Sequence, residues 1–172
     1  DEVAEAHGGG RAVEQGAGDS AVLVFTSPSA AVAAAVDLQR TMAAATWPTT
    51  DPVRIRAAVH AGEVWQNVDG TFAGPTMNRC GRLLGAAHGG QVVVSMTTVE
   101  LAGEAGSGVE VLDLGVHHLR GIDQPLHVGQ LCAEGMPTAF PPLRTVDASA
   151  ARIPRYRSAL VGQDALLDER FA

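Results

Sequence analysis

The sequence predicts an α+β protein with a mainly antiparallel sheet and helices packed on one face. Strand-like and helix-like segments follow one another in the order β-β-α-β-α-β-α-β-β, which is typical of α+β sandwiches. The chain has 172 residues, 46% of them hydrophobic. It is therefore long enough for one domain with a sizeable core and a short appendage.

The first part of the chain is expected to hold a helix end, a hairpin and a long helix. The stretch "DEVAEA" is helical in composition and is followed by the glycine-rich stop "HGGG". Residues 11–15 and 20–25 are rich in β-branched residues and flank a glycine-rich turn, which predicts a hairpin. The long helix has Ser27 as its expected N-cap and Pro28 at its first position. Its buried stripe is predicted to consist of Val32, Val36, Leu38 and Met42.

The later elements are shorter. Residues 53–64 alternate as a strand, and residues 74–90 predict a helix that is opened by Pro75 and closed by Gly89. From Phe140 onward the chain has three prolines and no strand pattern, which indicates a linker. Between these segments we expect a buried strand, a short helix and two late strands: "QVVVS", "MTTVELAGE", "VEVLDLGVHHLRG" and "LHVGQLC".

Composition excludes several classes of function. Acidic residues outnumber basic ones by 19 to 12, and the net charge of -7 disfavours direct binding to nucleic acid or to anionic membranes. No apolar run approaches the roughly 20 residues of a membrane span, and no signal peptide is evident, so a cytoplasmic protein is expected. Cys80 and Cys132 lack metal-site spacing and are expected to be buried free thiols. The chain has no lysine and no GxSxG sequence, which excludes a Walker A motif and a nucleophile elbow.

Three polar residues are candidate site residues, and each has a structural alternative. Asp19 lies in a glycine-rich turn, where aspartate is most often only a turn former. Asn78 and Arg82 are four residues apart on a predicted helix, so both project from one face. Such a pair is usually part of a solvated surface. His60 is expected to be a core or hairpin histidine, since no metal-binding spacing accompanies it.

Four segments, in this order and spacing, resemble the catalytic domain of class III adenylate and guanylate cyclases: "VEQGAGDSAVLVF", "RIRAAVHAGEV", "TFAGPTMNRCGRLLGAAHGGQVVVS" and "DLGVHHLRGIDQPLHVGQL". The resemblance covers residues 1–133. By this resemblance, the first strand and most of the first helix of the cyclase domain would lie upstream of residue 1. It is strongest to an actinobacterial group in which an ATPase region and a LuxR-type helix-turn-helix follow the cyclase domain. Residues 134–172 resemble the join and are expected to be a proline-containing linker towards that region.

The resemblance implies a ferredoxin-like domain that dimerises head to tail and converts ATP to cyclic AMP and pyrophosphate with Mg²⁺ or Mn²⁺. Asp19 matches the second of two metal-binding aspartates. The first is assigned to the strand ahead of residue 1, so this chain alone is expected to be inactive. From the opposite protomer, Asn78 matches the asparagine that orients the ribose, and Arg82 matches the arginine that stabilises charge on the α-phosphate. Arg120 lies near the family position whose basic residue holds the terminal phosphates.

Two positions depart from the adenine-reading pattern of the family. Gln15 stands where many adenylate cyclases have a lysine, and Thr71 stands where they have its companion aspartate, so GTP is an alternative to ATP. Two interpretations follow. The protein is a cyclase within a multidomain signalling regulator, which is favoured by the retained Asp19, Asn78 and Arg82. Alternatively it is a catalytically inactive cyclase-homology module that dimerises or binds nucleotide to control attached ATPase and DNA-binding domains.

Overall fold

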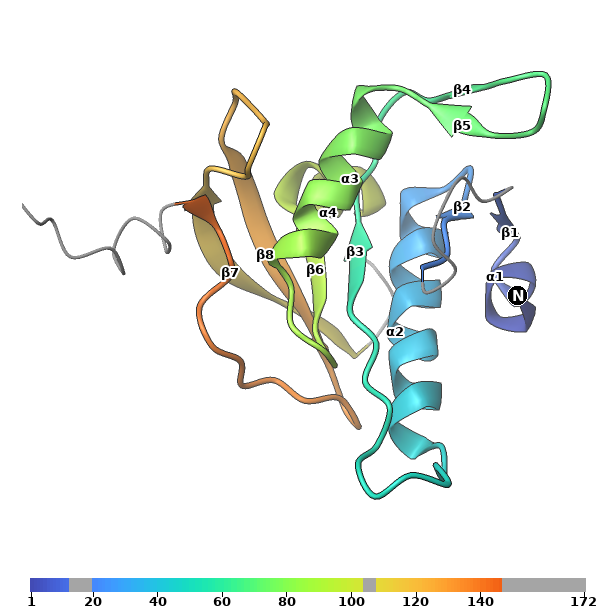
Figure 1. Ribbon diagram of the computed structural model, residues 1–172, viewed down its shortest axis with the longest axis vertical. Coiled ribbons are helices and arrows are strands. Elements are labelled where there is room, and N and C mark those ends of the chain that lie inside the picture. The colour runs from blue at the N-terminus through green and yellow to red at the C-terminus, as the bar shows by residue number, and fades with distance from the viewer. Residues whose placement is uncertain (13–19, 104–107, 147–172) are drawn as a thin grey trace, which may run out of the picture.

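The computed structural model describes residues 1–12, 20–103 and 108–146. Its main sheet has the strand order β3-β6-β8-β7, and two short hairpins, β1-β2 and β4-β5, lie outside it (Figure 1). In chain order the elements are α1 (Glu2–Ala6), β1 (Gly10–Arg11), β2 (Leu23–Val24), α2 (Pro28–Ala44), β3 (Ala57–Val59), β4 (Trp65–Gln66), β5 (Phe72–Ala73), α3 (Pro75–Ala86), β6 (Val92–Ser95), α4 (Met96–Ala102), β7 (Val109–His117) and β8 (Leu126–Ala133).

The main sheet is mainly antiparallel, as predicted. β8 pairs antiparallel with both β6 and β7, whereas β3 and β6 are parallel, with Ala58 opposite Val93. A register shift between Asp113 and Gly115 interrupts the β7-β8 ladder. The α+β class is thus confirmed. The parallel pair arises because the chain crosses over from β3 to β6 through the β4-β5 hairpin and α3.

Helices α2 and α4 cover one face of the sheet. Val32 and Val36 of α2 are buried against Val92 and Val94 of β6, which confirms half of the predicted stripe. The other half was wrong, because Leu38 and Met42 are only half-buried. Gln39 completes this buried side of α2, whereas Ala34, which is also buried, lies on the opposite side of the helix. Gln39 is accommodated there because its side-chain amide donates a 3.1 Å hydrogen bond to the carbonyl of Ile55.

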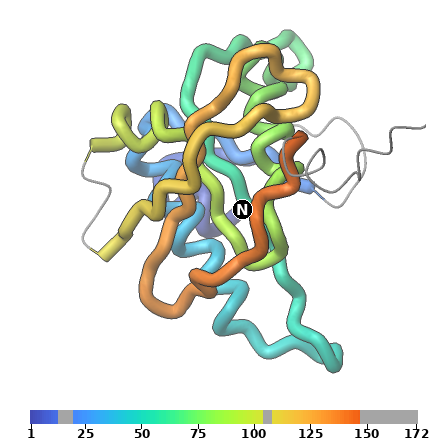
Figure 2. The backbone as a smooth tube through the Cα atoms, turned by 90° about the vertical axis from the view of Figure 1, so that its left-hand side faces the viewer, coloured from blue at the N-terminus to red at the C-terminus, as the bar shows by residue number. Residues whose placement is uncertain are grey.

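Helix α3 packs on the opposite face, so the helices do not all lie on one side as expected. Leu83 and Ala86 form a second core with Val93 and Val128, which point away from the α2 side because side chains alternate along a strand. The segment after β8 joins this core. Leu143 is buried in it, and the Arg144 amide donates to the Ala86 carbonyl at 3.0 Å. In Figure 2 this segment, coloured orange to red, runs beside the green α3.

The ends of several elements differ from the sequence-based expectation. The strand predicted over 53–64 is regular only over Ala57–Val59. Helix α3 ends at Ala86, because the backbone of the next residue, Ala87, is extended. The helix therefore stops three residues before Gly89, and Gly89 is not its C-cap. Helix α2 begins as predicted: the Ser27 hydroxyl accepts a 3.4 Å hydrogen bond from the Ala30 amide.

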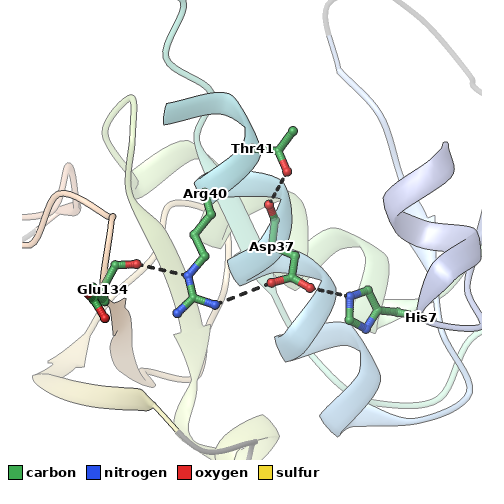
Figure 3. Close-up of polar contacts among 5 residues, drawn as sticks. All are labelled: His7, Asp37, Arg40, Thr41 and Glu134. Carbon is green, nitrogen blue, oxygen red and sulfur yellow. Dashed lines mark hydrogen bonds and ion pairs between the residues drawn. The ribbon is translucent and has the colours of Figure 1, made fainter. Parts of the chain in front are cut away.

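A chain of polar contacts ties α1 to α2 and to the end of β8 (Figure 3). The His7 ring nitrogen Nε2 lies 2.8 Å from Asp37 Oδ2, and Arg40 lies 3.6 Å from the other oxygen of the same carboxylate. Arg40 Nε also donates a 3.1 Å hydrogen bond to the carbonyl of Glu134, just beyond β8. Since only His7 and two glycines separate α1 from β1, these contacts help to fix the position of the start of the β1-β2 hairpin.

Candidate active site

Helix α3 presents Asn78 and Arg82 on its exposed side. Leu83, 0% exposed, and Ala86 hold the opposite side of the helix against the sheet. Asn78, Arg79 and Arg82 therefore project away from the core, with Asn78 and Arg82 one turn apart on the same face. The helix begins with Pro75 directly after Gly74, whose φ of 132° is open to glycine but strained for other residues.

The loop between β7 and β8 lies against Arg82. Gly121 has a φ of 75°, and a Cβ atom at this position would lie 3.7 Å from Arg82 Nη2. The absence of a side chain therefore leaves the guanidinium directly beside the loop backbone. Arg120, the preceding residue, is exposed. The structure thus places the loop that carries Arg120 beside Arg82, and the roles of Asn78, Arg82 and Arg120 stay predictions.

A hollow of about 220 Å³ lies between α3 and this loop. One wall is the first half of α3 and the other is the β7-β8 loop. Its lining residues are Pro75, Asn78, Arg79, Gly121, Ile122, Asp123 and Gln124. Sequence reasoning singled out only Asn78 among them, because the two walls are far apart in the chain.

The site presents unpaired hydrogen-bonding groups. Among the described residues, no hydrogen bond or ion pair engages the side chain of Asn78 or that of Arg82. Guanidinium groups without a carboxylate partner are well suited to bind phosphate oxygens, often through two hydrogen bonds. The arrangement can therefore receive an anion at Arg82 beside a neutral polar group at Asn78.

A polar network joins the chain just after β3 to β6 and α4. His60, at the end of β3, makes a 2.7 Å contact through Nδ1 with the Ser95 hydroxyl, which in turn lies 2.7 Å from the Thr98 hydroxyl. Burial, followed by the charge of Arg79, lowers the pKa of His60 below its usual value. His60 was expected to be a core or hairpin histidine; it is half-buried and hydrogen-bonded to the core residue Ser95, and its lowered pKa favours the neutral imidazole.

The two cysteines are free, as predicted, but each residue is only half-buried rather than fully buried. The Cys80 thiol lies on the inner side of α3 and points to the carbonyl of Ala58 at 3.6 Å. Burial raises the pKa of this thiol, which makes it a poor nucleophile. Cys80 therefore has a packing role between α3 and β3.

Thr71 lies in the β4-β5 hairpin, which the sequence did not predict. Its side chain is 4% exposed, and its hydroxyl donates a 2.6 Å hydrogen bond to Asp69 while accepting one of 2.9 Å from Asn67. These contacts lower the pKa of Asp69, chiefly through the Thr71 hydroxyl. The hydroxyl expected to contact the base is thus engaged within the hairpin. The turn sequence Asn67 to Gly70, with its Asp-Gly pair, was the signal for this hairpin.

Gln15 and Asp19 lie outside the described residues. The stem on either side of them is antiparallel, with Gly10 opposite Val24 and Arg11 opposite Leu23, so the predicted hairpin is confirmed at its base. Within the described ranges no group of three or more His, Cys, Asp or Glu side chains is placed to hold a metal ion. The assignment of a metal to Asp19 therefore stays a prediction.

Comparison with solved structures identifies the fold. An adenylate cyclase of Trypanosoma brucei in its monomeric state superposes with a TM-score of 0.67 at 23% identity, over 84% of this chain and 80% of that one. The adenylyl cyclase CyaB of Pseudomonas aeruginosa gives 0.55 at 17% identity, over 77% and 76%. The guanylate cyclase domain of RhGC from Catenaria anguillulae gives 0.56 at 14% identity, over 77% and 76%. The chain has the class III nucleotide cyclase fold.

Sequence relatives of this cyclase-fold chain are mycobacterial. Uncharacterized protein Rv0891c of Mycobacterium tuberculosis is 44% identical over 161 residues, which cover 92% of this chain and 54% of the relative. Uncharacterized protein Rv1359 of the same organism is 34% identical, covering 90% of this chain and 61% of the relative. The chain thus spans little more than half the length of the relatives it matches. No protein-family model matches it.

Proposed function

We propose that this chain is the catalytic domain of a nucleotide cyclase that converts ATP to cyclic AMP and pyrophosphate. The observation that carries the proposal is the pairing of Asn78 and Arg82 on the exposed side of α3, without partners among the described residues and beside a hollow. The cyclase fold supplies the context in which these two residue types at this spacing are expected to bind substrate.

The proposed reaction is an in-line displacement at phosphorus. The ribose 3′-oxygen forms a bond to the α-phosphorus, the bond from that phosphorus to the bridging oxygen of the β-phosphate breaks, and pyrophosphate leaves with the electron pair. The proton of the 3′-hydroxyl is released. A pair of Mg²⁺ or Mn²⁺ ions, when bound, would lower the pKa of this hydroxyl and screen the phosphate charges.

Each matched residue has a proposed role. Arg82 donates hydrogen bonds to α-phosphate oxygens, whose charge grows in the transition state. Asn78 orients the ribose, and Arg120 contacts the terminal phosphates. Asp19 is the proposed metal ligand, since hard carboxylate oxygens suit these ions. Gln15 and Thr71 remain the proposed base-contacting positions, with GTP as an alternative substrate.

The site is proposed to be shared in a head-to-tail homodimer. Asn78 and Arg82 face outward from α3, so a substrate bound between α3 and the β7-β8 loop is still open on the side that faces away from both. A second protomer would supply the hairpin with Asp19 and close the other side. A dimer would thus hold two such sites, each built from both chains.

We also propose that this domain belongs to a multidomain regulator of the actinobacterial type, with an ATPase region and a LuxR-type helix-turn-helix. The resemblance of residues 134–172 to the join supports this proposal.

One observation favours a second candidate function. The Thr71 hydroxyl is engaged by Asp69 and Asn67 and is mostly buried. If the base-contacting position does not reach the base, the domain would serve as an inactive module whose dimerisation or nucleotide binding regulates attached domains. In this second function the domain has the same fold but does not convert nucleotide to a cyclic product.

The deciding experiment measures cyclic AMP by mass spectrometry from the full-length protein with ATP and Mn²⁺. Arg82→Ala is expected to lower kcat by roughly 10² to 10³, the effect of removing one charge-stabilising contact. Arg56→Ala is the matched control, because Arg56 is exposed at the other end of β3 and outside the hollow. Equal rates for Arg82→Ala and wild type would refute the assignment. Nucleotide binding without any product would instead establish the regulatory module.

A further inference from the structure

The hollow beside Arg82 has a mixed lining that is unlike a phosphate site. Asp123 and Gln124 line its loop wall, and Asn78 and Arg79 line its helix wall. A carboxylate accepts hydrogen bonds but cannot donate them, and it repels phosphate. The Arg79 charge offsets that of Asp123, so the hollow as a whole is close to neutral. Such a lining matches an uncharged group that carries hydroxyl donors.

The size and position of the hollow narrow the choice of ligand group. At about 220 Å³ it is smaller than the roughly 300–1,000 Å³ of sites that enclose a whole drug-sized ligand. It therefore takes one part of a nucleotide. Asn78 lies in the hollow and Arg82 lies one helical turn further along, against Gly121. In a nucleotide, the uncharged group next to the α-phosphate is the ribose.

The loop that carries Asp123 is held in place. Ile122 is half-buried and packs against the core formed by Leu83 and its neighbours, and its amide donates a 3.1 Å hydrogen bond to the Leu119 carbonyl. Gly121 supplies the positive φ that the turn needs. In the described part of the chain the Asp123 carboxylate makes no hydrogen bond or ion pair. An unpaired carboxylate on a fixed backbone is preorganised to accept a hydrogen bond.

We propose that Asp123, assisted by Gln124, is a specificity-determining residue that accepts a hydrogen bond from the ribose 2′-hydroxyl and so selects ribonucleotides over 2′-deoxyribonucleotides. This inference rests on the proposed function, since it assumes that a nucleotide occupies the site. Carboxylates recognise ribose hydroxyls elsewhere by the same chemistry, because both lone pairs of an oxygen are available to the hydroxyl donor.

The test compares ATP with 2′-deoxy-ATP in the full-length protein. One readout is the ratio of kcat/KM values. The second is the ratio of dissociation constants for α,β-methylene ATP and its 2′-deoxy form, whose bridging carbon prevents cyclisation. Asp123→Ala is expected to reduce both ratios by roughly tenfold, the lower end for a hydrogen bond to a charged acceptor at an exposed site. Asp123→Asn keeps a neutral acceptor and should fall between Asp123→Ala and wild type.

The control is Asp51→Ala, which removes an exposed carboxylate that does not line the hollow and should leave both ratios unchanged. Wild-type ratios in Asp123→Ala would overturn the inference while leaving the proposed cyclase activity intact. Conversely, a binding preference that depends on Asp123, together with no cyclic product from any variant, would refute the proposed cyclase activity and support the inference. A wild-type protein that binds both analogues equally would also overturn the inference.

Discussion

A pair of buried glutamines anchors the end of α3, and its removal should cost measurable stability. Gln91 and Gln130 are each 2% exposed, and Gln91 Nε2 donates a 2.7 Å hydrogen bond to Gln130 Oε1. Gln91 Oε1 accepts from the His88 amide at 3.0 Å, and Gln130 Nε2 donates to the Thr138 carbonyl at 2.8 Å. The chain of bonds thus runs from the turn after α3, across β6 and β8, to the C-terminal segment.

Gln91→Met keeps the length of the side chain but leaves Gln130 Oε1 and the His88 amide without partners. A buried unsatisfied group costs about 1–3 kcal/mol, and the His88 amide is partly accessible to water, so we expect a loss of about 2–4 kcal/mol. For a chain of this size the melting temperature should fall by roughly 5–15 °C. Urea unfolding followed by circular dichroism measures the free energy directly.

The double variant Gln91→Met/Gln130→Met tests the reasoning. Each single variant orphans one buried group of the partner glutamine, but the double variant removes both of these groups together. The double variant should therefore lose about as much free energy of unfolding as one single variant, not twice as much. The difference from additivity is a coupling energy of about 2 kcal/mol. Strictly additive losses would show that the two side chains act independently, and the proposed hydrogen-bonded unit would be refuted.

Three further predictions concern the site. Mixing an Asp19→Asn chain with an Arg82→Ala chain should restore the cyclase activity that each variant lacks, because each heterodimer contains one intact site. If proven heterodimers show no recovery, the site lies within one chain. Gln15→Lys combined with Thr71→Asp should raise the ATP-to-GTP ratio of kcat/KM above a weakly selective wild type, and an unchanged ratio would show that these positions do not read the base. Because the pKa of His60 is lowered, the unfolded chain takes up a proton that the folded chain resists, so stability should fall as the pH drops below 6.5. His60→Gln should flatten this dependence, which pH-dependent urea titrations would detect.

Strong local signals made most elements predictable. Ser27 and Pro28 gave the start of α2, and the run of valines in β6 gave a strand that is buried on both faces. The β4-β5 hairpin was missed because its strands are two residues long and carry no periodicity. The side of the sheet that α3 occupies was also not predictable, since an apolar stripe shows which side of a helix is buried but not against which layer.

The candidate site was predictable only where it lies within one element. The spacing of Asn78 and Arg82 is local, so their common face followed from helical geometry. The hollow joins α3 to the β7-β8 loop, and its residues Asp123 and Gln124 carry no motif that marks them. The engagement of Thr71 by Asp69 likewise depends on how the hairpin closes.

The contrast between β6 and the β1-β2 stem has a consequence for hydrogen exchange. β6 lies between two strands, and all four of its residues are buried, so its amides should exchange only when the whole domain unfolds. In the described residues the β1-β2 stem has two residue pairs and lies outside the main sheet, so its amides should exchange through local opening. Free energy released on binding at this hairpin would thus appear first as protection of the Ala12 amide, which donates a 2.9 Å hydrogen bond to the Val22 carbonyl in this stem. Exchange in β6 would slow only as much as global stability rises.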